Sequence, residues 1–311
     1  MNVQLESVAK TFGRTRALSG VDLTIDAGER VALIGPNGSG KTTLIRIIMG
    51  MLRAQGTVTV GRWSPFDERP KLAEQVAYIP QIAPQMNVPL GRLIASISAV
   101  RGFEPARVEA VAERLDFRPS EHAGKSFREL SGGMKQKLLI ALALAARPRL
   151  LIMDEPSASL DAEARSNFFE LCADLPEETT ILLCSHRIEE VRHLIARIVA
   201  LEEGRVISDG PVERVVSELG RASIEVRVDP DLPDSTAAEL HNWLDERGFR
   251  QLAGGRFVVF LPSSEKFSTV EALLSKWGDQ LEDLVVNDLS KLQVEPTDTA
   301  PTTAKTNEER A

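Results

Sequence analysis

A glycine-rich stretch near the amino end constrains the fold of this chain more than any other feature. Residues 31–34 form an apolar run typical of a buried strand, and the next eight residues, GPNGSGKT, match the pattern G-x-x-x-x-G-K-[ST] without a gap. Apolar residues then recur at helical spacing, at Leu44, Ile47, Ile48 and Met51. A strand, a glycine loop and a helix in this order predict a phosphate-binding loop in an α/β fold.

The chemistry of such a loop follows from its residue types. Glycines leave room for backbone N–H groups to turn toward phosphate oxygens, and the helix N-terminus adds partial positive charge. Lys41 can reach the β- and γ-phosphates, and the Thr42 hydroxyl can bind Mg²⁺. A chance glycine loop before a core helix is the alternative, and the correct flanks on both sides argue against it. We therefore predict binding of a nucleoside triphosphate. The predicted contacts are Gly35, Pro36, Asn37, Gly38, Ser39, Gly40, Lys41, Thr42 and Thr43.

Length and composition limit the other functions open to the chain. Its 311 residues suggest about two domains, and a net charge of −8 argues against nucleic acid as the main partner. Cys172 and Cys184 lie in apolar surroundings, which predicts buried, reduced thiols. The longest uninterrupted apolar run, residues 138–146, is about half a membrane span, and the amino end lacks a signal-peptide pattern. We expect that the chain does not cross a membrane alone.

Further polar residues follow predicted buried strands directly. Gln81 follows the strand at 76–80, Asp154 and Glu155 follow 150–153, and His186 follows 179–184. Ligands of parallel sheets bind at the carboxyl ends of the strands, so we expect these side chains beside the phosphate loop. A solvated acidic loop is the alternative for Asp154 and Glu155. It is disfavoured because an apolar strand leads directly into the pair.

The remaining segments of the first part have weaker signals. Residues 2–8, 21–25 and 56–60 alternate like strands, and a hairpin is expected about Gly204. Prolines divide residues 82–129 into short amphipathic pieces, which predicts an inserted helical subdomain. Ser131, Gly132 and Gly133 open a helix and form a possible anion site, although such a turn is also an ordinary loop. Asp161 is a plausible helix cap, and Phe12, taken alone, is read as a core aromatic.

The order of these motifs resembles the ATP-binding cassette of an ABC transporter over about residues 1–218. Ser131–Gly133 matches the signature motif of that family, while Met134 stands where glutamine is usual. We expect this departure to be tolerated, since the serine and the glycine backbone make the anion contacts. The resemblance implies a phosphate-loop ATPase: a mixed sheet, an antiparallel amino-terminal sheet and the helical subdomain at 82–129.

The resemblance also implies roles for individual residues. Phe12 would stack on the adenine of ATP, and Thr42 and Gln81 would ligate Mg²⁺, with Asp154 holding the metal through water. Glu155 would be the general base, and His186 would contact the γ-phosphate. Ser131, Gly132 and Gly133 would bind ATP held by a second copy of the cassette. Two copies would thus enclose two ATP molecules in a homodimer.

Partners follow from the same resemblance. A separate polytopic membrane subunit is expected, docking near residues 82–100, with the chain cytoplasmic and peripheral on the inner face of the cell membrane. Export is favoured over import because of the small carboxyl-terminal extension, and drug, lipid and metal-enzyme maturation cargoes stay open. The alternatives are a soluble ABC-type ATPase acting on nucleic acid or ribosomes, and an orphan regulatory ATPase.

Residues 221–292 predict a second, small α+β domain without catalytic motifs. The pattern is strand (223–228), helix (236–247, with Ser235 as a possible cap), strand pair (250–261), helix (267–277) and strand (281–286), which is a ferredoxin-like order. A regulatory, dimerising or docking role is expected. The tail, 293–311, is rich in threonine, proline and charge, which predicts disorder.

Overall fold

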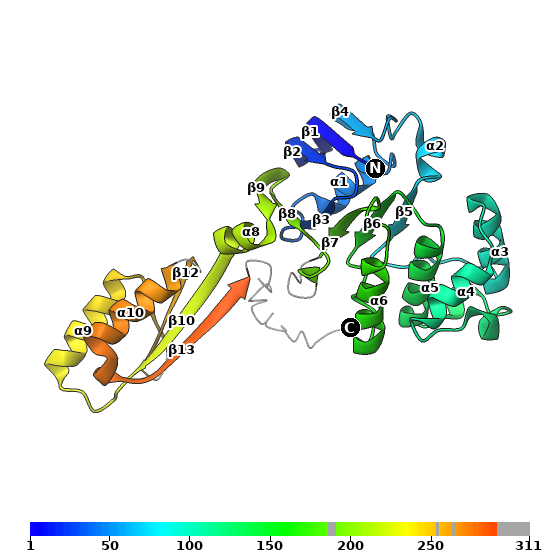
Figure 1. Ribbon diagram of the computed structural model, residues 1–311. Coiled ribbons are helices and arrows are strands. Elements are labelled where there is room, and N and C mark those ends of the chain that lie inside the picture. The colour runs from blue at the N-terminus through cyan, green and yellow to red at the C-terminus, as the bar shows by residue number, and fades with distance from the viewer. Residues whose placement is uncertain (186–190, 253–254, 263–264, 291–311) are drawn as a thin grey trace, which may run out of the picture. The chain divides into compact units, whose positions relative to one another are not determined.

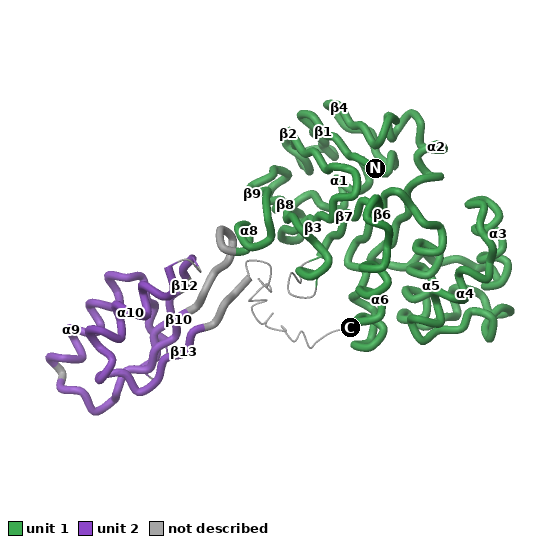
Figure 2. Tube along the Cα trace, in the orientation of Figure 1, with its two compact units in different colours: residues 1–218 green, residues 219–311 purple. Residues whose placement is uncertain are grey.

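The structure, a computed structural model, describes residues 1–185, 191–252, 255–262 and 265–290. The chain divides into two compact units, Met1–Glu218 and Leu219–Ala311, which are coloured separately in Figure 2. The predicted disordered tail lies outside the described residues, and so does His186. No helix of the described part is long and apolar enough to span a membrane.

A six-stranded sheet forms the centre of unit 1, with the strand order β5-β6-β7-β3-β8-β9. The first five strands run parallel, and β9 pairs antiparallel with β8. Every residue of β6 and β7 is buried, which is the pattern of strands covered on both faces. The strands are β3 (Arg30–Ile34), β5 (Val76–Ile79), β6 (Leu150–Asp154), β7 (Thr180–Cys184), β8 (Arg197–Glu202) and β9 (Arg205–Pro211).

A smaller antiparallel sheet, with the order β2-β1-β4, forms a second layer beside the first (Figure 1). Its strands are β1 (Val3–Phe12), β2 (Thr15–Ile25) and β4 (Gln55–Val60). These strands are longer than the alternating pattern predicts, so Phe12 ends β1 instead of lying between strands. The predicted mixed sheet with an antiparallel amino-terminal sheet is confirmed.

Helix α1 (Lys41–Ile48) begins in the glycine loop and packs in the apolar cluster between these sheets. Leu44, Ile47 and Ile48 are buried there as predicted, but Met51 is 43% exposed. The prediction for Met51 is wrong because the helix ends earlier. Gly50 adopts a φ of 67°, a left-handed conformation that commonly terminates helices.

The helical subdomain has its own apolar core, built around Phe127 and Val108. Helix α5 contributes Leu138, Ala141 and Leu142 to this core, so the subdomain extends past the predicted limit at residue 129. Its elements are α3 (Leu90–Arg101), α4 (Ala106–Glu113), the 3-10 turns Pro119–His122 and Phe127–Glu129, and α5 (Gly132–Ala145). Outside the helical subdomain, the described residues also form α2 (Arg69–Ala73), α6 (Ala162–Ala173) and α8 (Val212–Leu219).

Unit 2 is an antiparallel sheet in the order β11-β12-β10-β13, with α9 and α10 packed against one apolar cluster. Strand, helix, two strands, helix, strand in this order is the ferredoxin-like arrangement. Ser235 does not cap α9, because the helix begins at Asp234, two residues before the predicted start, and Ser235 lies inside it. The elements are β10 (Gly220–Val228), α9 (Asp234–Glu246), β11 (Arg250–Leu252), β12 (Arg256–Pro262), α10 (Lys266–Trp277), the 3-10 turn Gly278–Gln280 and β13 (Leu281–Ser290).

Candidate nucleotide-binding site

The carboxyl ends of four parallel strands bring the predicted site residues to one edge of the central sheet. The strand register pairs Ile79 with Met153, so Gln81 and Glu155 each lie two residues past a paired position. Cys184 pairs with Asp154 on one side and with Leu33, two residues before the loop, on the other. The strand that precedes His186 therefore ends at this edge, although His186 itself is not described.

The phosphate loop is held against its neighbours by contacts that only glycine permits. A Cβ on Gly35 would lie 2.1 Å from the Leu201 carbonyl oxygen, and one on Gly40 would lie 2.6 Å from that of Ala17. Both residues also have positive φ, at 149° and 107°. Backbone from β2 and β8 therefore fixes the position of the loop from outside.

Lys41 and Ser39 face the interior of the loop. The Lys41 ammonium donates to the Gly35 carbonyl at 2.8 Å and to the Pro36 carbonyl at 3.0 Å. Its charge is thus held at the loop, where a phosphate group would need it. Ser39 is buried, and its Oγ has no hydrogen-bond partner within the described residues. A polar atom buried in this way is a ready donor for a ligand oxygen.

One contact of the loop was missed by sequence reasoning. The Gly204 N–H donates to the Ser39 carbonyl at 3.0 Å, and the Gly204 carbonyl accepts from the Ser19 N–H at 2.8 Å. The turn of the β8–β9 hairpin therefore joins the loop to β2. The glycine in that turn indicated only a hairpin, since nothing in its spacing points to a distant partner.

Asp154 and Thr42 form the candidate metal site. The Thr42 hydroxyl donates to Asp154 Oδ2 at 3.3 Å, and Asp154 is 5% exposed. Burial raises the pKa of the Asp154 carboxyl, while the bond from Thr42 and the charges of Lys41 and Arg46 partly oppose that shift. A buried carboxylate beside a hydroxyl, both hard oxygen ligands, fits Mg²⁺, which takes one or two carboxylates and completes its shell with water and phosphate.

Glu155 follows with a strained backbone. Its φ of 46° lies in the left-handed region, which a residue with a Cβ rarely adopts. Its N–H donates to the Cys184 carbonyl at 3.0 Å, so the chain leaves β6 but stays attached to β7. Strain of this kind is concentrated at functional sites.

Gln81 and Phe12 are both exposed. Gln81 is exposed past the end of β5. Phe12 is 46% exposed, and the Lys10 ammonium lies 5.3 Å from the centre of its ring. Phe12 is therefore not a core aromatic, which was its default interpretation. An exposed ring in the β1–β2 hairpin is available for stacking.

Ser131, Gly132 and Gly133 begin α5, as predicted. The Ser131 Oγ caps the helix by accepting from the Met134 N–H at 3.2 Å, and Ser131 and Gly132 are exposed. Within the described residues, no hydrogen bond or ion pair joins this turn to the phosphate loop of the same chain. The turn is thus an exposed helix N-terminus, which is a candidate anion site.

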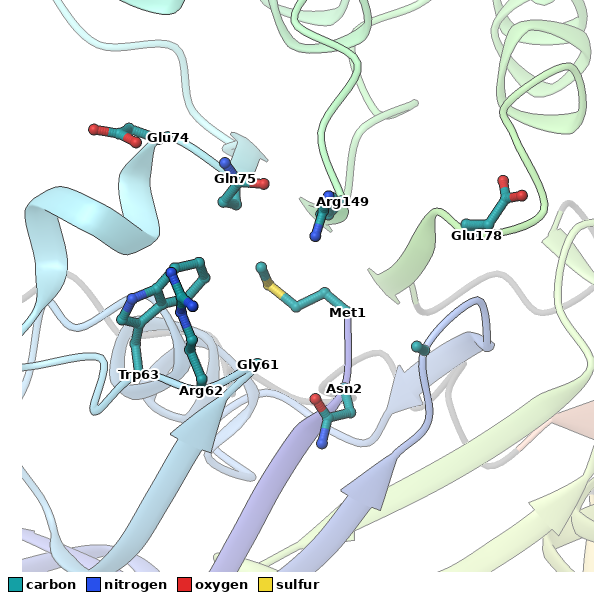
Figure 3. Close-up of a pocket in the computed structure, with 10 residues that line it drawn as sticks. Met1, Asn2, Gly61, Arg62, Trp63, Glu74, Gln75, Arg149 and Glu178 are labelled. Atoms are coloured by element: carbon teal, nitrogen blue, oxygen red, sulfur yellow. The ribbon is translucent and has the colours of Figure 1, made fainter.

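A cavity of about 810 Å³ lies at the opposite edge of the sheet (Figure 3). Gln75, Arg149 and Glu178 line it from positions just before β5, β6 and β7, and Met1 lies between Trp63 and Arg149. These are the amino ends of the parallel strands. The cavity is therefore separate from the nucleotide site, and no predicted site residue lines it.

Comparison with known proteins agrees with this geometry. A family model described as "ABC transporter" matches residues 18–158. The Nod factor export ATP-binding protein I of Paraburkholderia xenovorans (strain LB400) is 35% identical over 233 residues, 72% of this chain and 76% of that protein. The ABC transporter ATP-binding protein YtrB of Bacillus subtilis (strain 168) is 29% identical over 283 residues, 90% of this chain and 94% of that protein.

Among solved structures, a dimeric post-hydrolysis state of the ATP-binding cassette MJ0796, bound to ADP and Pi, is similar with a TM-score of 0.61 and 26% identity. That match covers 68% of this chain and 98% of the other. The family model covers the phosphate loop, the signature turn and the Asp154–Glu155 pair, and the relatives extend the match over most of the chain. The chain belongs to the ABC transporter family, as an ATP-binding subunit.

Proposed function

We propose that this ABC ATPase powers transport through a separate membrane subunit by ATP-driven closure and opening of a homodimer. The observation that carries the proposal is the exposed signature turn, Ser131–Gly133. Its exposed helix N-terminus suits an anion, yet within the described part of the chain no hydrogen bond links it to the phosphate loop. A second copy, arranged head to tail, would supply the missing phosphate.

The site chemistry is assigned to residues as follows. Phosphoryl transfer to water needs positive charge and N–H donors around the phosphate together with one base. Lys41, the loop N–H groups and the signature turn of the second copy surround the γ-phosphate, and Glu155 accepts a proton from the attacking water. Phe12 stacks on the adenine, and His186 orients the γ-phosphate.

Thr42 and Gln81 would ligate Mg²⁺, and Asp154 would hold the ion through water. The ion, when bound, neutralises phosphate charge. Asp154 already lies at hydrogen-bond distance from Thr42, and its buried carboxylate gains a compensating cation.

Residues 82–100 are the proposed contact surface for the membrane subunit. Ile82 is 80% exposed and Val100 is 83% exposed, although both are large and apolar. Export is favoured because the Paraburkholderia xenovorans relative named above is an export ATP-binding protein. A cytoplasmic location, peripheral on the inner face of the cell membrane, follows from this role. The proposal includes no nucleic-acid partner.

The proposal is tested with Glu155→Gln. Without the base, ATP should bind but turn over at a rate lower by about a hundredfold or more, so the dimer should accumulate closed. Light scattering should report a doubled mass with ATP and Mg²⁺. Lys41→Ala is the control, because it should lose ATP affinity in calorimetry and stay monomeric.

A Glu155→Gln protein that binds ATP yet stays monomeric would contradict the dimer. The membrane partner is tested with the same variant, tagged and captured from solubilised native membranes with ATP. Recovery of one polytopic membrane protein supports the transporter role. Recovery of ribosomal proteins without a membrane subunit would instead favour the soluble ATPase alternative.

A further inference from the structure

The first two turns of α5 bury two polar side chains that no motif explains. Gln136 is 2% exposed and Lys137 is 8% exposed, in a helix whose other buried residues are apolar. Buried polar groups are costly unless they are paired, so their partners indicate what the positions are for. Each of them has a partner in one loop, residues 155–161, which connects β6 to α6.

Gln136 holds the residue that follows the proposed base. Its Nε2 donates to the Pro156 carbonyl at 2.9 Å in a fully buried hydrogen bond. Pro156 is the next residue after Glu155, whose backbone is held at its other side by the Cys184 carbonyl. The strained conformation at Glu155 is therefore fixed from β7 on one side and from α5 on the other.

Lys137 holds the far end of the same loop. Its ammonium lies 3.4 Å from Asp161 Oδ2, and it donates to the Asp116 carbonyl at 3.4 Å. Asp161 in turn caps α6 by accepting from the Ala164 N–H at 2.8 Å. The Lys137 side chain is 10% exposed, while that of Asp161 is 65% exposed, so a buried cation meets the carboxylate at the surface of the loop.

A third contact completes one face of the helix. A Cβ on Gly133 would lie 3.2 Å from the Ser159 carbonyl oxygen, so the signature turn packs closely on the loop. Positions 133, 136 and 137 are spaced i, i+3 and i+4, which places all three on the same side of α5. The signature turn and the loop after Glu155 are therefore joined along two helical turns.

We propose that Gln136 and Lys137 are positioning residues that make the signature turn and the base of one chain move as one body. The inference rests on the proposed dimer. In that dimer the signature turn contacts the ATP of the opposite copy, while Glu155 acts on the ATP of its own copy. Through Gln136 and Lys137, ATP in one site sets the position of the base in the other.

The test uses mixed dimers of full-length chains carrying two different tags. One chain carries Glu155→Gln and cannot hydrolyse ATP in its own site. The other chain keeps Glu155 and is called the active chain, because only its site turns over. Gln136→Met, which keeps the length and helix propensity but removes the donor, is placed in either chain. In the active chain it should lower kcat about tenfold or more with little change in KM. In the Glu155→Gln chain it should have little effect.

The inference is overturned if Gln136→Met lowers kcat in the Glu155→Gln chain and not in the active chain. If Gln136 only shapes its own signature turn, the loss should appear when the substitution is in the Glu155→Gln chain, whose turn serves the active site. Equal losses in both placements, or none in either, also contradict it. If the unsubstituted chains form no ATP-dependent dimer, the proposed function fails together with this inference. If they do form the dimer but the placement result is the opposite one, only this inference fails.

A second pair of variants covers the case in which Gln136→Met chains do not assemble. Lys137→Met in the active chain should lower kcat, and Lys137→Arg should restore most of it, because Arg keeps a cation beside Asp161. A merely structural role would give the same loss in either chain. No rescue by Lys137→Arg would contradict the positioning role.

Discussion

The chain has two cysteines: Cys184 accepts the Glu155 N–H through its carbonyl, and Cys172 belongs to α6. Both side chains are fully buried, and burial raises the pKa of both thiols. The thiolate is the reactive form, so its fraction should stay small well above neutral pH.

We therefore expect iodoacetamide to label neither cysteine in the folded chain, with no acceleration between pH 7 and pH 9. An ordinary thiol, with a pKa of about 8.5, would react faster across that interval. Mass spectrometry of the alkylated protein checks this result, and full labelling in denaturant is the control. Rapid labelling of either cysteine under native conditions would show that its burial is incomplete.

At the scale of single residues, the sequence predicted chemistry better than contacts. The sequence placed Asp154 and Glu155 at the sheet edge, because two acids directly follow an apolar strand. Gln136 was missed because one polar residue in an apolar helix indicates a buried partner without saying which. Phe12 needed the family resemblance, since an aromatic residue beside a turn is equally typical of a core position.

At the scale of elements, Arg197 of β8 joins its own strand to β9 and to the segment just before β3. Arg197 of β8 donates to Asp209 Oδ2 of β9 at 2.7 Å and to Glu29 Oε1, just before β3, at 3.0 Å. All three side chains are less than one third exposed. These bonds raise the pKa of Arg197, opposed by burial, so the guanidinium stays charged.

Arg197→Met should destabilise the β8–β9 hairpin by about 2 kcal/mol, because two partly buried carboxylates lose their cation. Hydrogen exchange followed by mass spectrometry should be faster in peptides covering β8 and β9. Arg118→Met is the matched control. Arg118 pairs with Glu113 and Glu121 at 3.7 and 3.5 Å while 65% exposed, so its loss should cost under about 0.5 kcal/mol. Equal effects of the two substitutions would contradict the assignment.

The elements themselves were largely predictable, and their order in the sheet was not. Apolar runs located β3, β5, β6 and β7, because buried parallel strands are nearly continuous in apolar residues. Nothing in those runs states that β3 lies between β7 and β8, since that order depends on long-range packing. The end of α1 was missed for a similar reason, because Met51 keeps the helical spacing after Gly50 has ended the helix.

At the scale of the whole molecule, the two units have separate apolar cores. One cluster of unit 1 surrounds α1, another fills the helical subdomain, and a third lies within unit 2. Among the residues that the structure describes, none of these three clusters draws from both units. Each unit therefore has what independent folding requires.

We expect a chain ending at residue 218 to fold and to bind ATP with the affinity of the full chain, because every predicted contact with ATP precedes that point. Calorimetric titration with ATP and Mg²⁺ measures the affinity, and circular dichroism measures folding. The same truncation with Lys41→Ala is the control for specific binding. A marked loss of affinity in the truncated chain would show that unit 2 contributes to the site.

The left-handed backbone at Glu155 has a consequence for anyone who redesigns this protein. Glycine adopts a φ of 46° without the strain that any residue with a Cβ incurs there, and asparagine tolerates it better than glutamate does. A variant library ranked by melting temperature alone would therefore drift away from glutamate at position 155. Selection for thermal stability would therefore favour a substitution that yields a well-folded cassette able to bind ATP but unable to hydrolyse it.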